Sequence, residues 1–326
     1  KPHYGWDADE REFHYTYDEL RRELTKTVTP SGSSTKVLEV TEYGEGVTDD
    51  TLHNLRGRPY KIYDGAGLQT ILDYDFGGKP ISTTRKFVAD HTQHPDWTTI
   101  GSVSMETDTY TTEMAYDALE RLLTVTTPDG GITTNAYEQS GALFSVRVDD
   151  VHSLDTDIVN EIYYDAKGRR IKIKYENGAT TTYEYDENTF RITRIRTTRS
   201  SDSAVLQDLK YWYDPVGNIT LQKDDAQQSV YYDNTVADPK NDYTYDALYR
   251  LIKCEGREHA GSNAAVSYND TTRKGLAPLP TDASAMRRYA QYYSYDEVGN
   301  MLQMKHTTTG GTGNWTRDFT IDTASN

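Results

Sequence analysis

The sequence predicts an all-β fold, an extended antiparallel strip of hairpins. Three observations support this: a recurring Tyr-Asp turn, a two-residue period between the turns, and little helical patterning. The chain has 326 residues, of which 35% are hydrophobic and 11% aromatic, too aromatic for a disordered acidic chain. Tyrosine dominates, with 27 Tyr against 6 Phe and 4 Trp, and a buried tyrosine ring can still offer its hydroxyl to water or a partner. We therefore expect thin, solvated sheets.

One short unit recurs along the chain and predicts a turn. An aromatic or apolar residue precedes Tyr-Asp; two or three variable residues follow, often with Gly, then Arg or Asn and an apolar strand. Asp214-Pro215-Val216-Gly217 has the residues favoured in a type I turn. The Asp carboxylate can accept bonds from backbone N–H groups, and Gly supplies a positive φ. The Tyr-Asp copies begin at Tyr17, Tyr63, Tyr74, Tyr116, Tyr164, Tyr185, Tyr213, Tyr232, Tyr245 and Tyr295.

The clearest copies supply the residues to which we assign a structural role in the turns. Three other copies, at residues 18–21, 117–120 and 246–249, lack the Gly, so each needs a different turn or a strained non-Gly residue. The predicted turn residues are Tyr17, Asp18, Tyr63, Asp64, Tyr116, Asp117, Tyr164, Asp165, Gly168, Tyr213, Asp214, Gly217, Tyr245, Asp246, Tyr295, Asp296 and Gly299.

Between the turns, apolar and polar residues alternate, which is typical of half-buried strands. Ile171-Lys172-Ile173-Lys174-Tyr175 alternates in this way, and so does Thr180-Thr181-Thr182-Tyr183-Glu184-Tyr185. Asn177-Gly178 lies between the two runs and predicts a tight hairpin with a primed turn. The sequence thus predicts a β-meander over residues 160–198.

Two segments depart from the repeat, and we expect both to be loop inserts in a single repeat region that spans residues 1–326. They are residues 88–109 and 260–292, and the second contains a helical pattern from Thr281 to Tyr292 that predicts one short helix. A strip of hairpins cannot bury both faces within one unit, so it must pack on neighbouring units and curl. We therefore predict a sheet that spirals to form part of a hollow shell.

Charge and composition argue against several classes of partner. The net charge is -16 and no basic patch stands out, so a nucleic-acid partner is not expected. No apolar run approaches the roughly 18 residues of a membrane span, so we expect no direct membrane insertion. The chain begins at Lys1, without an initiator methionine or a signal peptide, and we expect it to be a segment of a longer polypeptide.

Candidate catalytic and metal-binding residues have simpler structural interpretations. Adjacent acids such as Asp224-Asp225 point to opposite faces of a strand, and Asp is common in turns. His91 and His94 are spaced for a metal site, but no second ligand motif accompanies them. Cys254, the only cysteine, lacks the flanking basic groups of a catalytic thiolate. We predict no catalytic residue, no cofactor and no bound metal.

Several runs of the sequence, spread over residues 50–317, resemble the Rhs/YD-repeat region of insecticidal toxin-complex B and C components. The clearest are Tyr211-Trp212-Tyr213-Asp214-Pro215-Val216-Gly217-Asn218-Ile219, Tyr243-Thr244-Tyr245-Asp246-Ala247-Leu248-Tyr249-Arg250-Leu251, Gly256-Arg257-Glu258-His259 and Tyr295-Asp296-Glu297-Val298-Gly299-Asn300-Met301. The resemblance implies a β-sheet cocoon that encloses a cytotoxic C-terminal domain of the same chain or of a partner chain. In that family a self-cleaving core uses paired Asp-Pro-x-Gly motifs, whereas this sequence has one, at residues 214–217. The autoprotease and the toxin domain are thus expected outside this segment.

Two functions from different classes follow from these observations. The first is the wall of a secreted toxin shell, which shields a C-terminal effector before delivery and contacts other toxin-complex subunits. The second is a carbohydrate-binding or adhesion module, because a Tyr-rich sheet face with acidic neighbours can also stack on sugars. Saturable glycan binding by the chain would favour the second. An enzyme is a third interpretation, which would require hydrolysis that a single Asp substitution abolishes.

Overall fold

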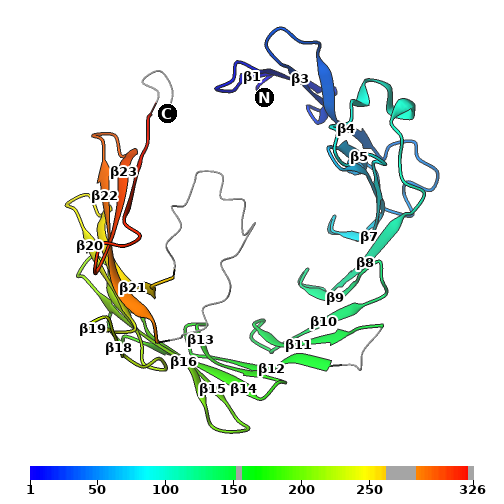
Figure 1. Ribbon diagram of the computed structural model, residues 1–326. Helices are drawn as coiled ribbons and strands as arrows, with labels where there is room; N and C mark the ends of the chain where they lie inside the picture. Colours follow the sequence, from blue (N-terminus) through cyan, green and yellow to red (C-terminus); the bar gives the residue numbers. More distant parts are fainter. Residues whose placement is uncertain (152–155, 262–283, 322–326) are drawn as a thin grey trace. The chain divides into compact units, whose positions relative to one another are not determined.

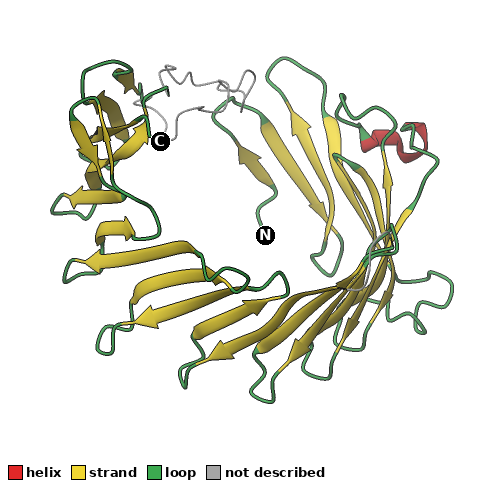
Figure 2. Ribbon diagram, turned by 60° about the horizontal axis from the view of Figure 1, so that its bottom comes forward, coloured by secondary structure: helices red, strands yellow, loops and turns green. Residues whose placement is uncertain are grey.

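The computed structural model describes residues 1–151, 156–261 and 284–321. It divides into two compact units, Lys1–Asn160 and Glu161–Asn326. Almost all of the regular structure consists of β-strands, drawn in yellow in Figure 2. Among the described residues, 22 strands are assigned to one antiparallel sheet, and two more form a separate hairpin. The predicted all-β, antiparallel fold class is therefore confirmed.

In the first unit each strand pairs antiparallel with the strands that precede and follow it in sequence. Figure 1 shows this sequential order in the progression of colour. The strands are β1 (Tyr4–Trp6), β2 (Glu12–Tyr17), β3 (Glu23–Thr29), β4 (Lys36–Tyr43), β5 (Pro59–Asp64), β6 (Gly67–Tyr74), β7 (Pro80–Phe87), β8 (Tyr110–Tyr116), β9 (Leu122–Thr126), β10 (Ile132–Tyr137) and β11 (Leu143–Asp149).

The second unit continues the same pattern, and β12 (Thr156–Tyr164) spans the boundary. The separate hairpin interrupts the meander between β17 and β20, which pair with each other. The strands are β13 (Arg170–Tyr175), β14 (Ala179–Tyr185), β15 (Ile192–Arg199), β16 (Val205–Tyr213), β17 (Ile219–Asp224), β18 (Val230–Tyr232), β19 (Thr235–Ala237), β20 (Lys240–Tyr245), β21 (Leu251–His259), β22 (Met286–Tyr295), β23 (Met301–Thr308) and β24 (Trp315–Asp318).

The insert at residues 88–109 carries the main hydrophobic cluster of the first unit. It contains a short 3-10 helix, η1 (Trp97–Ser102), drawn in red in Figure 2. Trp97 is only 2% exposed and packs with Tyr63 and Val88. Its indole Nε1–H donates to the Asp64 carbonyl at 3.0 Å. The insert, which connects β7 to β8, is thus packed against β4 and β5.

The prediction of a short helix from Thr281 to Tyr292 is wrong for the residues of this range that the structure assigns to a strand. Residues 286–292 belong to β22, which pairs with β21 on one side and β23 on the other, while residues 281–283 lie outside the described part. A short isolated helix is marginal in water, whereas a strand between two neighbours satisfies its backbone groups on both edges. The expected insert at residues 260–292 therefore ends before Met286.

The predicted hairpin at Asn177-Gly178 forms, but with a different turn. β13 and β14 pair antiparallel around it, and Gly178 N–H donates to the Tyr175 carbonyl at 3.1 Å. A primed turn centred on Asn177-Gly178 needs a positive φ at Asn177, the first central residue, yet only Gly178 has one, at 78°. The turn therefore runs from Tyr175 to Gly178 with Gly in its fourth position, as in a type I turn.

Candidate functional site: the repeat turns

The repeat turns lie on one edge of the sheet within each unit. In an antiparallel meander, alternate connections fall on the same edge, because each strand reverses the direction of the chain. The turns after β2, β6, β8 and β10 therefore share an edge in the first unit, and those after β12, β14, β16, β20 and β22 share an edge in the second. The insert at residues 88–109 and the β18–β19 hairpin connect at the opposite edges.

Asp246 shows how the turn is built. Its backbone N–H donates to the Arg250 carbonyl at 2.9 Å, and its carbonyl accepts from Tyr249 N–H at 3.0 Å. Its Oδ1 accepts from Leu248 N–H and Arg250 N–H at 2.8 and 2.9 Å. The carboxylate thus satisfies backbone donors that the turn would leave without a partner. Equivalent main-chain bonds form at Asp18, Asp75, Asp117, Asp165, Asp214 and Asp296.

The fourth turn position has a left-handed backbone in every copy of this type. Gly217 has a φ of 116° and Gly299 of 101°, as the Asp-x-x-Gly pattern suggests. The copies without Gly keep the same turn, with Arg21 at 62°, Glu120 at 61° and Tyr249 at 64°. Of the two possibilities left open by the sequence, a strained non-Gly residue is therefore the one observed.

We expect opposite effects from two substitutions at this position. Gly217→Val should destabilise the chain by about 1–2 kcal/mol, because a β-branched residue must enter the left-handed region. Tyr249→Gly should be neutral or stabilising by up to about 1 kcal/mol, because it relieves the same backbone strain. The change also removes few packing contacts, since Tyr249 is 59% exposed. Urea melts of both variants measure the difference. Unchanged melting of Gly217→Val would contradict the turn assignment.

At most repeat turns, the hydroxyl of the tyrosine before the Asp bonds to the preceding repeat. Tyr245 Oη donates to the Ile219 carbonyl at 2.9 Å, and Tyr295 Oη donates to the Leu251 carbonyl at 2.8 Å. Each acceptor lies at the start of the strand that follows the previous repeat turn. Tyrosines at the same edge with carbonyl acceptors are Tyr17, Tyr43, Tyr74, Tyr137, Tyr185 and Tyr213. Tyr116 instead contacts the Met114 sulfur, and Tyr164 lies half-buried at the end of β12.

An arginine four residues after the Asp links successive turns, a role that the sequence reasoning missed. Arg250 Nε donates to Asp246 Oδ2 at 2.7 Å, and its Nη1 donates to the Asp296 carbonyl of the next turn at 3.0 Å. Its guanidinium lies 5.0 Å from the centre of the Tyr295 ring. Arg169 makes a similar link: it bonds to Asp165, stacks on Tyr185 at 4.3 Å, and donates to the Phe190 carbonyl of the next turn at 3.3 Å. The recurrence of Arg at this spacing was the available signal.

A β-bulge accompanies these turns. The register shifts immediately before Tyr213, Tyr245 and Tyr295, so that one extra residue enters the strand after each turn. The same shift precedes Tyr17, Tyr43, Tyr74, Tyr116, Tyr137 and Tyr185. A bulge bends its strand and increases the local twist. Each repeat therefore contributes a bend to the sheet at a fixed place.

Two Tyr-Asp copies form other structures at the opposite edge. Tyr63 is buried in the Trp97 cluster, and Asp64 starts a tight hairpin while its carboxylate binds Arg85. Asp233 and the residue after it join β18 to β19 with φ of 46° and 56°, the two positive values of a type I′ turn. These copies match the repeat in sequence but not in geometry.

We expect the turn carboxylates to make the stability of the fold depend on pH. Hydrogen bonds from the backbone N–H and side chain of Arg169 lower the pKa of Asp165, and the backbone N–H of Arg250 acts likewise on Asp246. A lowered folded pKa gives stability that is present above the unfolded value, about 3.9, and is lost as pH falls through the folded pKa. We expect a constant melting temperature from neutral pH to about pH 5 and a fall below about pH 4. Asp165→Asn should shrink that fall, whereas exposed Glu297→Gln should not.

The other acids and the cysteine have structural partners. Asp50 is 6% exposed and binds Gly46 N–H and Arg56. Asp224 Oδ1 accepts from Asp208 N–H at 2.9 Å. The Cys254 thiol is buried, and this burial raises its pKa. Within the described ranges, no group of three or more His, Cys, Asp or Glu residues could hold a metal ion.

A row of cations crosses four strands of the second unit, which the sequence did not suggest. Arg194, Lys210, Lys223 and Lys240 are successive cross-strand partners. Like charges directly opposite are destabilising, so acids must intervene. Asp225 does so between two of them: hydrogen bonds from Lys210 and then Lys223 lower its pKa to about 2.

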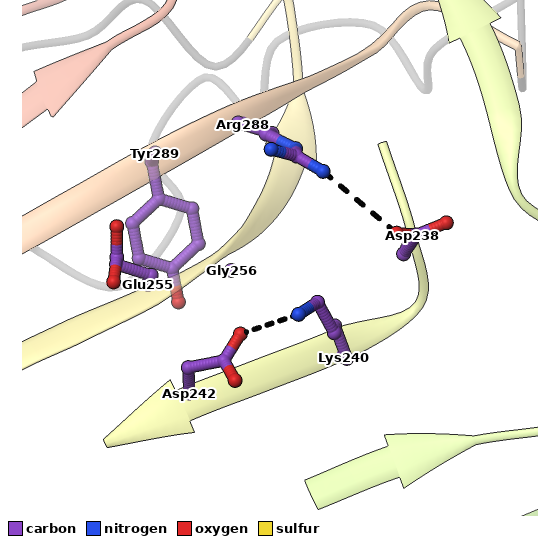
Figure 3. A pocket seen from close by; sticks show the side chains of 7 residues that line it. All are labelled: Asp238, Lys240, Asp242, Glu255, Gly256, Arg288 and Tyr289. Carbon is purple, nitrogen blue, oxygen red and sulfur yellow. Dashed lines mark ion pairs between the residues drawn. The ribbon is translucent and has the colours of Figure 1, made fainter. Parts of the chain in front are cut away.

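The adjoining pocket in the second unit has a volume of about 380 Å³ and a mixed charge. Figure 3 shows Lys240 directed toward Asp242, at 3.0 Å, and Arg288 toward Asp238, at 3.7 Å. Glu255 also lines the pocket and pairs with Lys253. The charges around this pocket are therefore largely balanced among themselves.

Comparisons with known proteins identify the repeat. The RHS repeat model matches residues 164–201, which contain two of the turns. The chain is also 31% identical over 316 residues to toxin subunit YenC2 of Yersinia entomophaga, covering 94% of the chain. The chain therefore contains an RHS repeat. Toxin subunit YenC1 of the same organism is likewise 31% identical, over 313 residues. The RHS-repeat chain spans about a third of these relatives, 32% and 31% of their lengths.

Solved structures agree with this assignment. The crystal structure of TcdB2-TccC3 matches 99% of the RHS-repeat chain with a TM-score of 0.85 and 29% identity, and the match covers 16% of that protein. The Photorhabdus luminescens Tc holotoxin pore with the TccC3-D651A mutation also matches, with the same TM-score and identity over 15% of its chain. The RHS-repeat fold is thus that of toxin-complex proteins, as the sequence resemblance suggested. No helix in the described residues is long and apolar enough to cross a membrane.

Proposed function

We propose that this chain is a wall segment of a toxin-complex shell, which encloses and shields a C-terminal effector before delivery. The proposal rests on the bonds that join successive repeat turns along one edge of the sheet. Several repeat turns bind their neighbours through a tyrosine hydroxyl, and some of them through an arginine as well, as between the turns at Asp246 and Asp296. Such a strip gains stability from every added repeat, which is the property of solenoid arrays and suits a long continuous wall.

The regular bulges support the same role. A flat sheet does not enclose a volume, and curvature needs bulges or kinks at defined positions. The bulges beside Tyr213, Tyr245, Tyr295 and the other repeat tyrosines with a register shift supply such positions along the edge. The similarity to YenC2 and to TcdB2-TccC3 agrees with this role, although the chain covers only part of each.

The proposal implies particular partners and a location. The enclosed partner is the effector polypeptide, either the continuation of the same chain or a second chain, and the outer partners are other toxin-complex subunits. The assembly would act outside the producing cell. The role of this segment is structural, with self-cleavage and toxicity residing elsewhere in the polypeptide.

Mass measurement and proteolysis of the complete polypeptide that contains this chain test the proposal. We expect a C-terminal piece that stays with the shell under native conditions, separates under denaturing conditions, and resists protease until the shell unfolds. A two-chain shell would protect its cargo only after the partner is added. An effector digested at the same rate in the assembled and the unfolded protein would contradict enclosure.

One surface observation favours the alternative of a carbohydrate-binding module. A shallow pocket of about 400 Å³ is lined by Tyr211, Trp212 and Tyr213 beside Asp186. Trp212 is 44% exposed, and an exposed aromatic ring beside a carboxylate is a common arrangement for sugar stacking. Saturable glycan binding that Trp212→Ala removes would support this function. Protection of the effector does not depend on Trp212, so the two functions separate in that variant.

A further inference from the structure

A second cavity lies in the first unit, at the edge opposite the repeat turns. Its volume is about 430 Å³, within the usual range of small-molecule sites. Strands β2, β3 and β4 form its floor, and the turns at their ends and the insert at residues 88–109 form its rim. The lining residues are Arg11, Phe13, Val28, Pro30, Lys36, Leu38, Glu39, Gly65, His94 and Pro95.

The insert that forms one wall of the cavity is held in place by specific bonds. Asp96 Oδ1 accepts from the Val37 N–H of β4 at 3.1 Å and from Thr98 N–H at 3.0 Å. Trp97, the next residue, is buried and bonded to the strand below it. His94 and Pro95 directly precede this anchor, so the wall of the cavity is preformed, which lowers the cost of binding.

The floor of the cavity is apolar, and its rim carries cationic side chains. Phe13, Val28 and Leu38 supply the apolar floor. Glu39, the one acid in the lining, lies 3.3 Å from Lys26 and is neutralised by it. Arg11 is similarly engaged by two aspartates of its own turn. Lys36 and His94 are the other polar groups of the lining, and both are exposed, with the Asp96 carboxylate within electrostatic reach of Lys36.

We propose that this cavity binds a small amphiphilic anion, an acyl or aryl chain that carries a carboxylate or sulfonate. The apolar body would cover Phe13, Val28 and Leu38, where burial of its methylene groups away from water favours binding. The anionic head would meet Lys36 and His94 at the rim. A local cation is needed, because the chain as a whole carries a charge of -16 and repels anions at long range. Of the two histidines in the His91-x-x-His94 spacing, His94 lines this cavity.

Fluorescence titration of the 326-residue chain with anilinonaphthalene sulfonate tests the proposal. We expect saturable, blue-shifted binding at one site, and displacement by dodecanoate but not by acetate. Lys36→Glu should weaken binding about tenfold, because it replaces an attraction at the rim by a repulsion. Leu38→Asp should abolish binding by placing a charge on the floor. Lys305→Glu, on β23 of the second unit, is the matched charge control and should bind normally.

Circular dichroism and melting of each variant separate loss of the site from loss of the fold. Lys36 is exposed, so its variant should fold and keeps the test decisive even if Leu38→Asp does not fold. Absence of saturable binding, or equal affinity in the Lys36→Glu and Lys305→Glu variants, would overturn the proposal. A dye signal that grows as the protein melts would indicate partly unfolded chain and would count against it equally.

Discussion

Trp97→Ala should destabilise the first unit by about 3–5 kcal/mol, the range for truncating a buried Trp or Phe to alanine. Trp97 is 2% exposed and touches the cluster formed with Tyr63 and Val88. Its removal leaves a cavity at that cluster and deprives the Asp64 carbonyl of its donor. Because native domains are stable by only about 5–15 kcal/mol, a loss of this size is a large fraction of the total.

Thermal and urea melts of the chain measure this effect, and Trp212→Ala is the matched control. Trp212 is 44% exposed, so its truncation should change stability by less than about 1 kcal/mol. A Trp97 variant that melts like the wild type would mean that the insert at residues 88–109 is not packed on the strands. The pocket beside it would then lack its wall as well.

Arg287→Met should cost about 3 kcal/mol in the second unit, because it leaves the largely buried Glu258 carboxylate, 18% exposed, without its main partner. The Arg287 side chain is 7% exposed, and its Nε and Nη2 lie 2.8 and 2.7 Å from Glu258 Oε1. The other oxygen of Glu258 lies 3.2 Å from Nε2 of His306, which stacks between Tyr289 and Trp315. This cluster joins β21, β22, β23 and β24.

A double-mutant cycle isolates the interaction. Glu258→Leu combined with Arg287→Met should recover much of the stability lost in the single variant, because no buried charge is then unpaired. Urea melts of the wild type, both single variants and the double variant supply the four values. Additive losses would show that Arg287 stabilises the sheet through packing and not through its charge.

The sequence alone predicted the class of the fold and the chemistry of the repeat turns. The Tyr-Asp turns and the two-residue period indicated antiparallel hairpins, because both signals come from residues close together in the chain. The Asp carboxylate and the positive φ in the fourth position were predictable for the same reason. For the copies at Arg21, Glu120 and Tyr249, the strained non-Gly residue that is observed was one of the two alternatives that the sequence left open.

Contacts between residues far apart in sequence were decided only by the tertiary structure. Tyr63-Asp64 and Tyr232-Asp233 share the repeat dipeptide, yet they lie at the opposite edge, where no next repeat turn is available. The helical pattern before Tyr292 was overridden because two flanking strands offered a full set of hydrogen bonds. The arginine link from Arg250 to Asp296 spans 46 residues, and only the pairing of strands brings its ends together. Local patterns fix the turns, whereas register and the order of strands fix which turns meet.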